Sequence, residues 1–264
     1  MQLNVQGQSC FVSSGAAAFN PALPTVVLVH GAQLDHLVWD VQMQGLSERG
    51  YGLLAVDLPG HGRNRDMAAL QTIDAMADWV IQLMDAAGVR SATIVGHSMG
   101  SLIALECAAR HPERVKGIAL LATAVPMRVA PALLDATCID EPGAIAKINV
   151  WSHSKEAAVS AAADANLRTM QSQKPGVLHN DFAACNDYTT GLASAAAVRC
   201  PALLVSGDRD VMTPPKAAGE LAETLVSSRT LIIPGSGHNL MGEAPAAVTE
   251  ALVSFATDPS KATT

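Results

Sequence analysis

The sequence predicts an α/β fold: a mainly parallel, twisted β-sheet flanked by helices, with a helical cap inserted between two late strands. Short apolar runs rich in Val, Ile and Leu alternate along the chain with segments of helical periodicity, which is typical of right-handed βαβ units. The connection formed by residues 124–199 is far longer than the usual crossover helix. We therefore expect a core made of residues 1–123 and 200–264, and a helical cap made of residues 124–199.

The predicted strands are apolar runs bounded by Gly, Pro or Asp. They span residues 25–29, 52–56, 92–95, 115–121, 202–205 and 230–233. Runs that are apolar on both faces, rather than alternating, are typical of parallel strands covered by helices on each side. These runs are therefore expected to form the buried sheet.

Three core helices are predicted. The clearest begins after Thr72, a good N-cap, presents an apolar stripe to the core and ends at Gly88. Residues 101–109 leave almost no polar face, so that helix should be buried, and residues 248–255 carry another one-sided stripe. Within the cap, prolines separate helical stretches expected at residues 132–136, 143–150 and 156–169.

The composition limits the classes of function. The formal net charge of the 264 residues is -7, and the 17 Lys and Arg are scattered, so we expect neither nucleic acid nor an anionic membrane surface as a partner. The five cysteines are widely spaced and lack a CxxC pair, which fits neither a disulfide framework nor a metal site. A signal-peptide pattern and a run of ~18 apolar residues are both missing, so a cytoplasmic location is expected. The sequence leaves a homodimer open.

Residues 96–100 read Gly-His-Ser-Met-Gly and match the G-x-S-x-G nucleophile elbow. The motif lies directly after a predicted strand and directly before the predicted buried helix. A serine on such a tight turn exposes its hydroxyl, and the flanking glycines let the strand and helix backbones approach without a Cβ clash. In an ordinary loop this motif would usually be structural, so it is the strand and helix context that predicts Ser98 as a nucleophile.

A serine hydroxyl is a weak nucleophile unless a neighbouring base removes its proton, so a histidine must lie close to Ser98. Of the eight histidines, His238 is the best candidate, because it follows the last predicted strand in a glycine-rich loop. The imidazole then needs a carboxylate that fixes its tautomer. Asp208 and Asp210 both follow the preceding strand; we prefer Asp210, which stands further into the loop, and keep Asp208 as the alternative.

Acyl transfer also requires two backbone N–H donors aimed at the developing oxyanion, since losing one typically costs ~10²-fold or more in rate. Met99, directly after Ser98, is expected to supply one donor. Ala32, in the loop after His30 and Gly31, is expected to supply the other.

The order Ser98, Asp210, His238, with each residue at a strand end, resembles the α/β-hydrolase family. The resemblance covers nearly the whole chain and includes Val29-His30-Gly31, Asp57-Leu58-Pro59-Gly60-His61-Gly62, Gly207-Asp208-Arg209-Asp210 and Gly235-Ser236-Gly237-His238. In that family a serine often follows the basic residue of the glycine-rich turn, whereas here Asn64 follows Arg63. The family also places a cap where residues 124–199 lie, which implies that substrate binds between cap and sheet.

Together these residues predict a serine hydrolase that cleaves a small carboxylic ester, lactone or thioester through an acyl-enzyme, without a metal or an organic cofactor. Two alternatives remain: a carbon–carbon bond hydrolase of ring-fission products, and a small-ligand receptor that keeps the triad but turns over slowly. His97, Met127, Trp151 and His153 are candidates for the substrate pocket, although ordinary helix packing accounts for such residues equally well.

Overall fold

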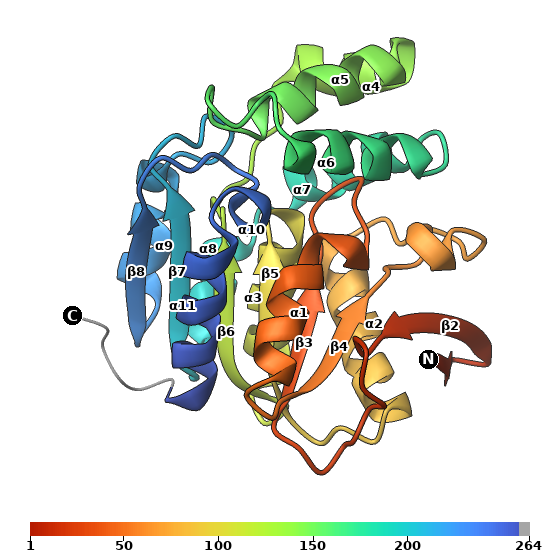
Figure 1. Cartoon of the computed structure of the whole chain (residues 1–264), viewed down its shortest axis with the longest axis vertical. Coiled ribbons are helices and arrows are strands. Elements are labelled where there is room, and N and C mark those ends of the chain that lie inside the picture. The colour runs from red at the N-terminus through yellow and green to blue at the C-terminus, as the bar shows by residue number, and fades with distance from the viewer. Residues whose placement is uncertain (259–264) are drawn as a thin grey trace.

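The six apolar runs form six neighbouring parallel strands in the computed structural model, which describes residues 1–258 (Figure 1). Their order in the sheet is β4-β3-β5-β6-β7-β8. The predicted fold class is therefore confirmed. The strands are β3 (Thr25–Val29), β4 (Gly52–Val56), β5 (Ala92–His97), β6 (Val115–Leu121), β7 (Ala202–Gly207) and β8 (Ser228–Ile233).

Two N-terminal strands extend the sheet, although the apolar pattern of the sequence does not predict them. β1 (Gln2–Val5) and β2 (Gln8–Ser13) pair antiparallel, and β2 then pairs antiparallel with β4. Polar residues interrupt both segments, so neither stands out as a buried run. The hairpin turn is Gln6-Gly7, and both residues have positive φ, as tight two-residue hairpins require.

Helices cover both faces of the sheet because alternate strand side chains point to opposite sides. Val27 and Val29 join one apolar cluster with α2 (Ile73–Ala86) and α3 (Met99–Arg110), whereas Val26 and Leu28 join another with α1 (Asp40–Ser47) and α11 (Pro245–Thr257). Figure 1 shows α1 and α11 in front of the strands and α2 and α3 behind them. The core helices are α1 (Asp40–Ser47), α2 (Ile73–Ala86), α3 (Met99–Arg110), α9 (Gly219–Thr224), α10 (Leu240–Glu243) and α11 (Pro245–Thr257), with single 3-10 turns at His36–Trp39, Gly62–Asn64 and Pro215–Ala218.

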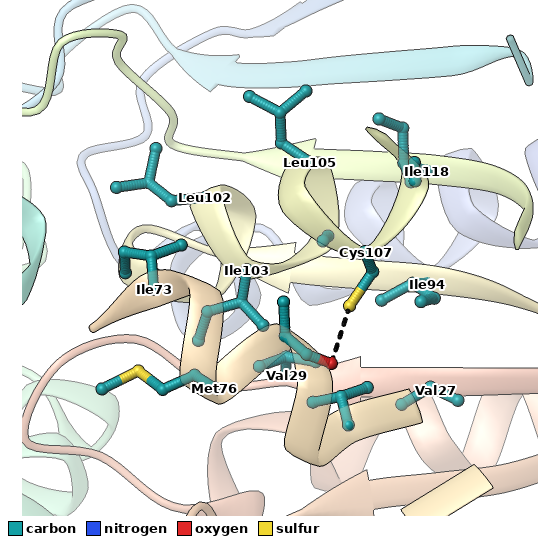
Figure 2. Packing of buried hydrophobic residues seen from close by; sticks show 14 of the residues in the cluster. Val27, Val29, Ile73, Met76, Ile94, Leu102, Ile103, Leu105, Cys107 and Ile118 are labelled. Carbon is teal, nitrogen blue, oxygen red and sulfur yellow. Dashed lines mark hydrogen bonds between the residues drawn. The ribbon is translucent and has the colours of Figure 1, made fainter. Parts of the chain in front are cut away.

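Helix α3 is buried nearly all round, as its sequence predicts. Figure 2 shows Leu102, Ile103 and Leu105 of α3 packed among side chains of α2 and of strands β3, β5 and β6. The Cys107 thiol donates a hydrogen bond to the carbonyl oxygen of Ala77 in α2, at 3.5 Å. Full burial of each large aliphatic side chain contributes about 1.5–3 kcal/mol, so this helix and the turn before it are firmly held.

The long connection between β6 and β7 is helical, and it has two parts. Its first four helices lie over one end of the sheet, and we call residues 131–187 the cap (Figure 1). α8 (Gly191–Ala197) instead packs against α3, where Ser194 and Tyr188 donate hydrogen bonds to the buried Glu106 carboxylate. The cap helices are α4 (Pro131–Ile139), α5 (Glu141–Trp151), α6 (Ala161–Ser172) and α7 (Val177–Asp187).

A separate apolar cluster joins the cap to the core. It includes Ile145, Met170 and Phe182 from the cap and Leu34 from the loop after β3. Among residues 1–258, none of the helices has the length and apolar content needed to cross a membrane.

Candidate active site

Ser98 lies on a strained turn between β5 and α3. Its φ is 51°, in the left-handed region that residues with a side chain rarely adopt. Such a conformation costs of order 1–3 kcal/mol and persists only where the surroundings enforce it. Here the Ser98 N–H donates to the Leu121 carbonyl oxygen at 2.9 Å, and α3 is clamped by its apolar packing. The turn therefore presents the Ser98 side chain at the carboxyl edge of the sheet.

The two glycines of the motif allow the close backbone approach that the sequence predicts. A Cβ at Gly96 would collide with the backbone carbonyl of Gly100, and a Cβ at Gly100 would collide with the carbonyl groups of Val29 and His30. Both positions therefore require glycine if strand and helix are to meet at this turn.

His238 and Asp210 form a buried pair next to this turn. The His238 Nδ1–H donates to Asp210 Oδ2 at 2.8 Å, and both side chains are almost completely shielded from solvent. Burial by itself would raise the pKa of Asp210, but the imidazole of His238 and the hydrogen bonds from Thr213 hold that pKa well below its ordinary value. Asp210 is therefore an ionised acceptor for the imidazole.

Asp208, the alternative carboxylate, does not contact His238. Its Oδ1 accepts the Gly235 N–H at 2.7 Å and lies 3.8 Å from the Arg209 guanidinium. Asp210 instead turns inward, because its Oδ1 accepts the N–H groups of Met212 and Thr213. These backbone contacts place the Asp210 carboxylate, rather than that of Asp208, against the His238 imidazole.

His97 supports the loop that carries His238. Its Nε2–H donates to the His238 carbonyl oxygen at 3.0 Å, and the two rings lie 5.0 Å apart between centroids. Burial lowers the pKa of His97 to about 3, and the nearby His238 adds to this effect. His97 is therefore a neutral hydrogen-bond donor, and it also lines a small inner cavity of about 30 Å³ beside Ser98.

A cavity of about 420 Å³ opens beside Ser98 and His238. Ala32 lines it from the core, and Met127, Leu133 and Trp151 line it from the other side. Apart from Ser98, Thr213, His238 and Arg128, the side chains around it are apolar. The wall of the cavity is therefore mostly apolar, and Ser98 and His238 supply polar groups at its reactive end.

His153 requires a correction, because it lines neither cavity at Ser98 although a pocket position is predicted for it. Both ring nitrogens are already in use. Nδ1–H donates to the Asn149 carbonyl oxygen at 2.7 Å, and Nε2 accepts from the Asn239 amide at 3.1 Å. His153 thus ties the end of α5 to the residue that follows His238.

Ala32 and Met99 both lie at the reactive end, and within the described part of the chain neither main-chain N–H has an acceptor. Met99 is the first residue of α3, where the N–H has no intrahelical acceptor. Ala32 follows β3, and within residues 1–258 no acceptor engages its N–H. Two donors are thus free to bind an anionic oxygen.

Asp35, His36 and Asp57 place one potential metal ligand each within 4.8 Å of the others. Their atoms already make hydrogen bonds: Asp57 Oδ1 accepts from the His36 ring and main chain, and Asp57 Oδ2 accepts from the Arg63 N–H. The contacts join the loops after β3 and β4.

Comparison with known proteins agrees with this architecture. A model of the alpha/beta hydrolase family matches residues 26–251. The chain belongs to the α/β-hydrolase family.

Proteins similar to this α/β hydrolase in sequence or structure include enzymes that are named for different reactions. It is 31% identical over 228 residues to a pimeloyl-[acyl-carrier protein] methyl ester esterase from Chromobacterium violaceum, covering 81% of this chain and 87% of that one. A shorter stretch of 97 residues is 38% identical to the dihydrolipoyllysine-residue acetyltransferase component of the acetoin cleaving system from Cupriavidus necator, covering 37% of this chain but only 26% of that protein. The structure of a thermophilic esterase from Thermogutta terrifontis superposes with a TM-score of 0.84 at 21% identity, covering 99% of both chains.

Several site residues of this α/β hydrolase escape sequence reasoning. Thr213 donates to Asp210 Oδ2 at 2.7 Å and lies 3.1 Å from His238 Nδ1; the Asp-x-x-Thr spacing after β7 is a local signal for such a turn. Gln33, His61 and Asp181 form a second buried cluster beside Ala32. No local pattern predicts that cluster, because Asp181 comes from the cap.

Proposed function

We propose that this α/β hydrolase cleaves small carboxylic esters through an acyl-enzyme, with Ser98 as nucleophile, His238 as general base and Asp210 as the carboxylate that orients the imidazole. The observation that carries the proposal is the buried 2.8 Å hydrogen bond between His238 Nδ1 and Asp210 Oδ2. His238 and the strained Ser98 both line the cavity of about 420 Å³. Strain of this kind is typical of functional turns.

The reaction follows from the positions of these groups. Ser98 Oγ attacks the ester carbonyl carbon while His238 Nε2 takes the hydroxyl proton, and the imidazolium is stabilised by Asp210. The carbonyl oxygen becomes an oxyanion facing the N–H groups of Ala32 and Met99. Collapse of the tetrahedral intermediate expels the alcohol, which receives the proton from His238. Water then attacks the acyl-enzyme by the same route and releases the acid.

The cavity supports an ester with an apolar, aliphatic acyl group. Its wall is formed by Leu133, Phe182 and Val129 among others, and such a surface favours groups that lose little hydration on binding. Lactones and thioesters react by the same steps. The ring of a lactone or the thiol leaving group of a thioester changes how the substrate fits the cavity, but it does not change the chemistry.

Covalent labelling tests the proposal directly. A fluorophosphonate is expected to form one adduct per chain, which peptide mapping assigns to Ser98, because only an activated serine attacks this reagent at a useful rate. Ser98→Ala should abolish the adduct, whereas Ser172→Ala, at an exposed cap serine, should leave it intact. The absence of any adduct on the folded wild-type chain would overturn the proposed function.

The shape of the cavity predicts a second result. Leu133→Trp should fill part of the acyl site, so kcat/KM for p-nitrophenyl hexanoate should fall about 10-fold or more relative to the acetate, since each lost methylene contact is worth roughly 0.8 kcal/mol. The same change at Leu37, an exposed residue that does not line this cavity, should leave the ratio unchanged. An unchanged ratio in Leu133→Trp would exclude this cavity as the acyl site.

A further inference from the structure

Gln33, the residue after Ala32, holds an unusual backbone conformation. Its φ is 59°, and the residue is almost fully buried in the loop that follows β3. A side-chain-bearing residue stays in the left-handed region only where specific contacts hold it. The peptide unit that Ala32 and Gln33 share contains the Ala32 carbonyl group and the Gln33 N–H, so a contact at the Gln33 N–H fixes the plane of that unit. The Ala32 N–H lies in the preceding peptide unit, which is joined to it through the Ala32 Cα, so holding Gln33 restricts the direction in which the Ala32 N–H points.

The contacts that hold Gln33 come from the cap. Its main-chain N–H donates to Asp181 Oδ2 of α7 at 2.8 Å. Its side-chain Nε2 donates to the carbonyl oxygen of Met170 in α6 at 2.9 Å. Both partners lie more than 130 residues further along the chain, in helices that cover the end of the sheet (Figure 1).

Asp181 is itself fixed from the core side. The same Oδ2 accepts a hydrogen bond from His61 Nε2 at 2.9 Å, and both side chains are almost fully excluded from solvent. His61 lies in the turn after β4, where its Nδ1 contacts the Pro59 carbonyl oxygen at 3.2 Å. Burial alone would lower the pKa of His61, but the Asp181 carboxylate raises it above its ordinary value, so the pair is charge-assisted. The loop after β3 and the turn after β4 thus both donate a hydrogen bond to the Asp181 carboxylate of the cap.

We infer that Asp181 is a positioning residue for the proposed ester hydrolysis: from the cap, it holds Gln33 in its left-handed conformation and thereby aims the Ala32 N–H at the oxyanion. The inference rests on the proposed function. It assigns the cap a share in rate enhancement in addition to its share in forming the acyl site. Asp181 does not touch the reacting atoms, and it acts through the loop of residues 31–34.

The expected signature is a loss in kcat at nearly constant KM. Removing one oxyanion donor costs about 10²–10³-fold in kcat, so misdirecting the Ala32 N–H should cost about 10–100-fold. Asp181→Ala should therefore lower kcat for p-nitrophenyl butyrate by that factor and change KM less than about 3-fold. It should also raise the Ki of a trifluoromethyl ketone, which forms a tetrahedral adduct, by about the same factor as kcat falls, because both depend on oxyanion binding.

Three further variants separate positioning from folding. His61→Leu combined with Asp181→Leu removes the acceptor without leaving an unpaired buried charge, and such double replacements are often neutral for stability. This double variant should fold and show the same loss as Asp181→Ala. Asp181→Asn keeps an oxygen that can accept from Gln33 and should recover most of kcat. The control is Gln173→Ala, which removes the buried cap-to-core hydrogen bonds to Gly62 and Asp35 without touching Gln33, and which should stay within about 3-fold of wild type.

Each outcome has a distinct meaning. If wild type shows no turnover that depends on Ser98, the proposed function fails and the inference fails with it. If wild type is active and the folded double variant keeps its kcat and its trifluoromethyl ketone affinity, the inference alone is overturned. A matched fall in kcat and in affinity for the ketone, with Gln173→Ala unaffected, establishes Asp181 as a positioning residue.

Discussion

Ser98→Ala is expected to lower kcat for p-nitrophenyl esters by about 10⁴–10⁶-fold, the largest effect of any single substitution in this chain. The nucleophile acts as a unit with its base, so removing it leaves only the rate enhancement from binding and from the oxyanion donors. The unfolding temperature should change little, because the Ser98 side chain packs no core. Steady-state kinetics of the purified variant and the wild type, at matched protein concentrations, measures the loss.

A companion variant tests whether the turn stores strain. Ser98→Gly should be as inactive as Ser98→Ala. Its free energy of unfolding should be higher than that of Ser98→Ala, by up to about 1–3 kcal/mol, because glycine adopts a φ of 51° without a Cβ penalty. Chemical denaturation of the two variants side by side gives the difference. If Ser98→Ala and Ser98→Gly both kept more than a few per cent of wild-type turnover, Ser98 would not be the nucleophile.

Asp210→Asn is expected to lower kcat by about 10³–10⁴-fold, the second largest effect. In the wild-type chain Asp210 Oδ2 accepts the His238 Nδ1–H at 2.8 Å, which leaves Nε2 unprotonated and able to accept a proton in the proposed reaction. An amide at this position can donate to Nδ1 and so stabilise the wrong tautomer, and it cannot stabilise an imidazolium. The structure should survive, because the amide oxygen can still accept from Met212 and Thr213.

Asp208→Asn is the matched control for this prediction. The two carboxylates are two residues apart on the same loop, but Asp208 accepts from the Gly235 N–H and is partly exposed. We expect its kcat to stay within about 3-fold of wild type. A reversal, with Asp208→Asn inactive and Asp210→Asn active, would show that the wrong carboxylate has been assigned to the imidazole.

The cap contacts two loops of the reactive end, each at the residue directly after a predicted site residue. Gln33 follows Ala32 and is held by Asp181 of α7, whereas Asn239 follows His238 and is held by His153 and by the Ser152 carbonyl oxygen. The cap therefore helps to hold both loops in place, and His153 does so from outside the cavity.

The sequence by itself determines the six parallel strands, the buried helix α3 and the turn that carries Ser98. These features are local: apolar runs, helical periodicity and glycine spacing act over a few residues, so their signals survive without knowledge of neighbours. Local sequence also predicts that His238 and the two candidate aspartates, Asp208 and Asp210, lie near Ser98. Each follows a predicted strand, and the carboxyl ends of parallel strands meet at one edge of a sheet.

Only the tertiary structure decided which buried polar groups meet. Gln33 and Asp181 are 148 residues apart, and His61 and Asp181 are 120 apart. Local periodicity carries no information about such pairs, since they depend on how the cap helices seat against the loops of the core. For the same reason the sequence predicts His153 in the pocket, whereas its ring is paired with Asn149 and Asn239 instead. A buried polar side chain must find a partner, and packing selects which one.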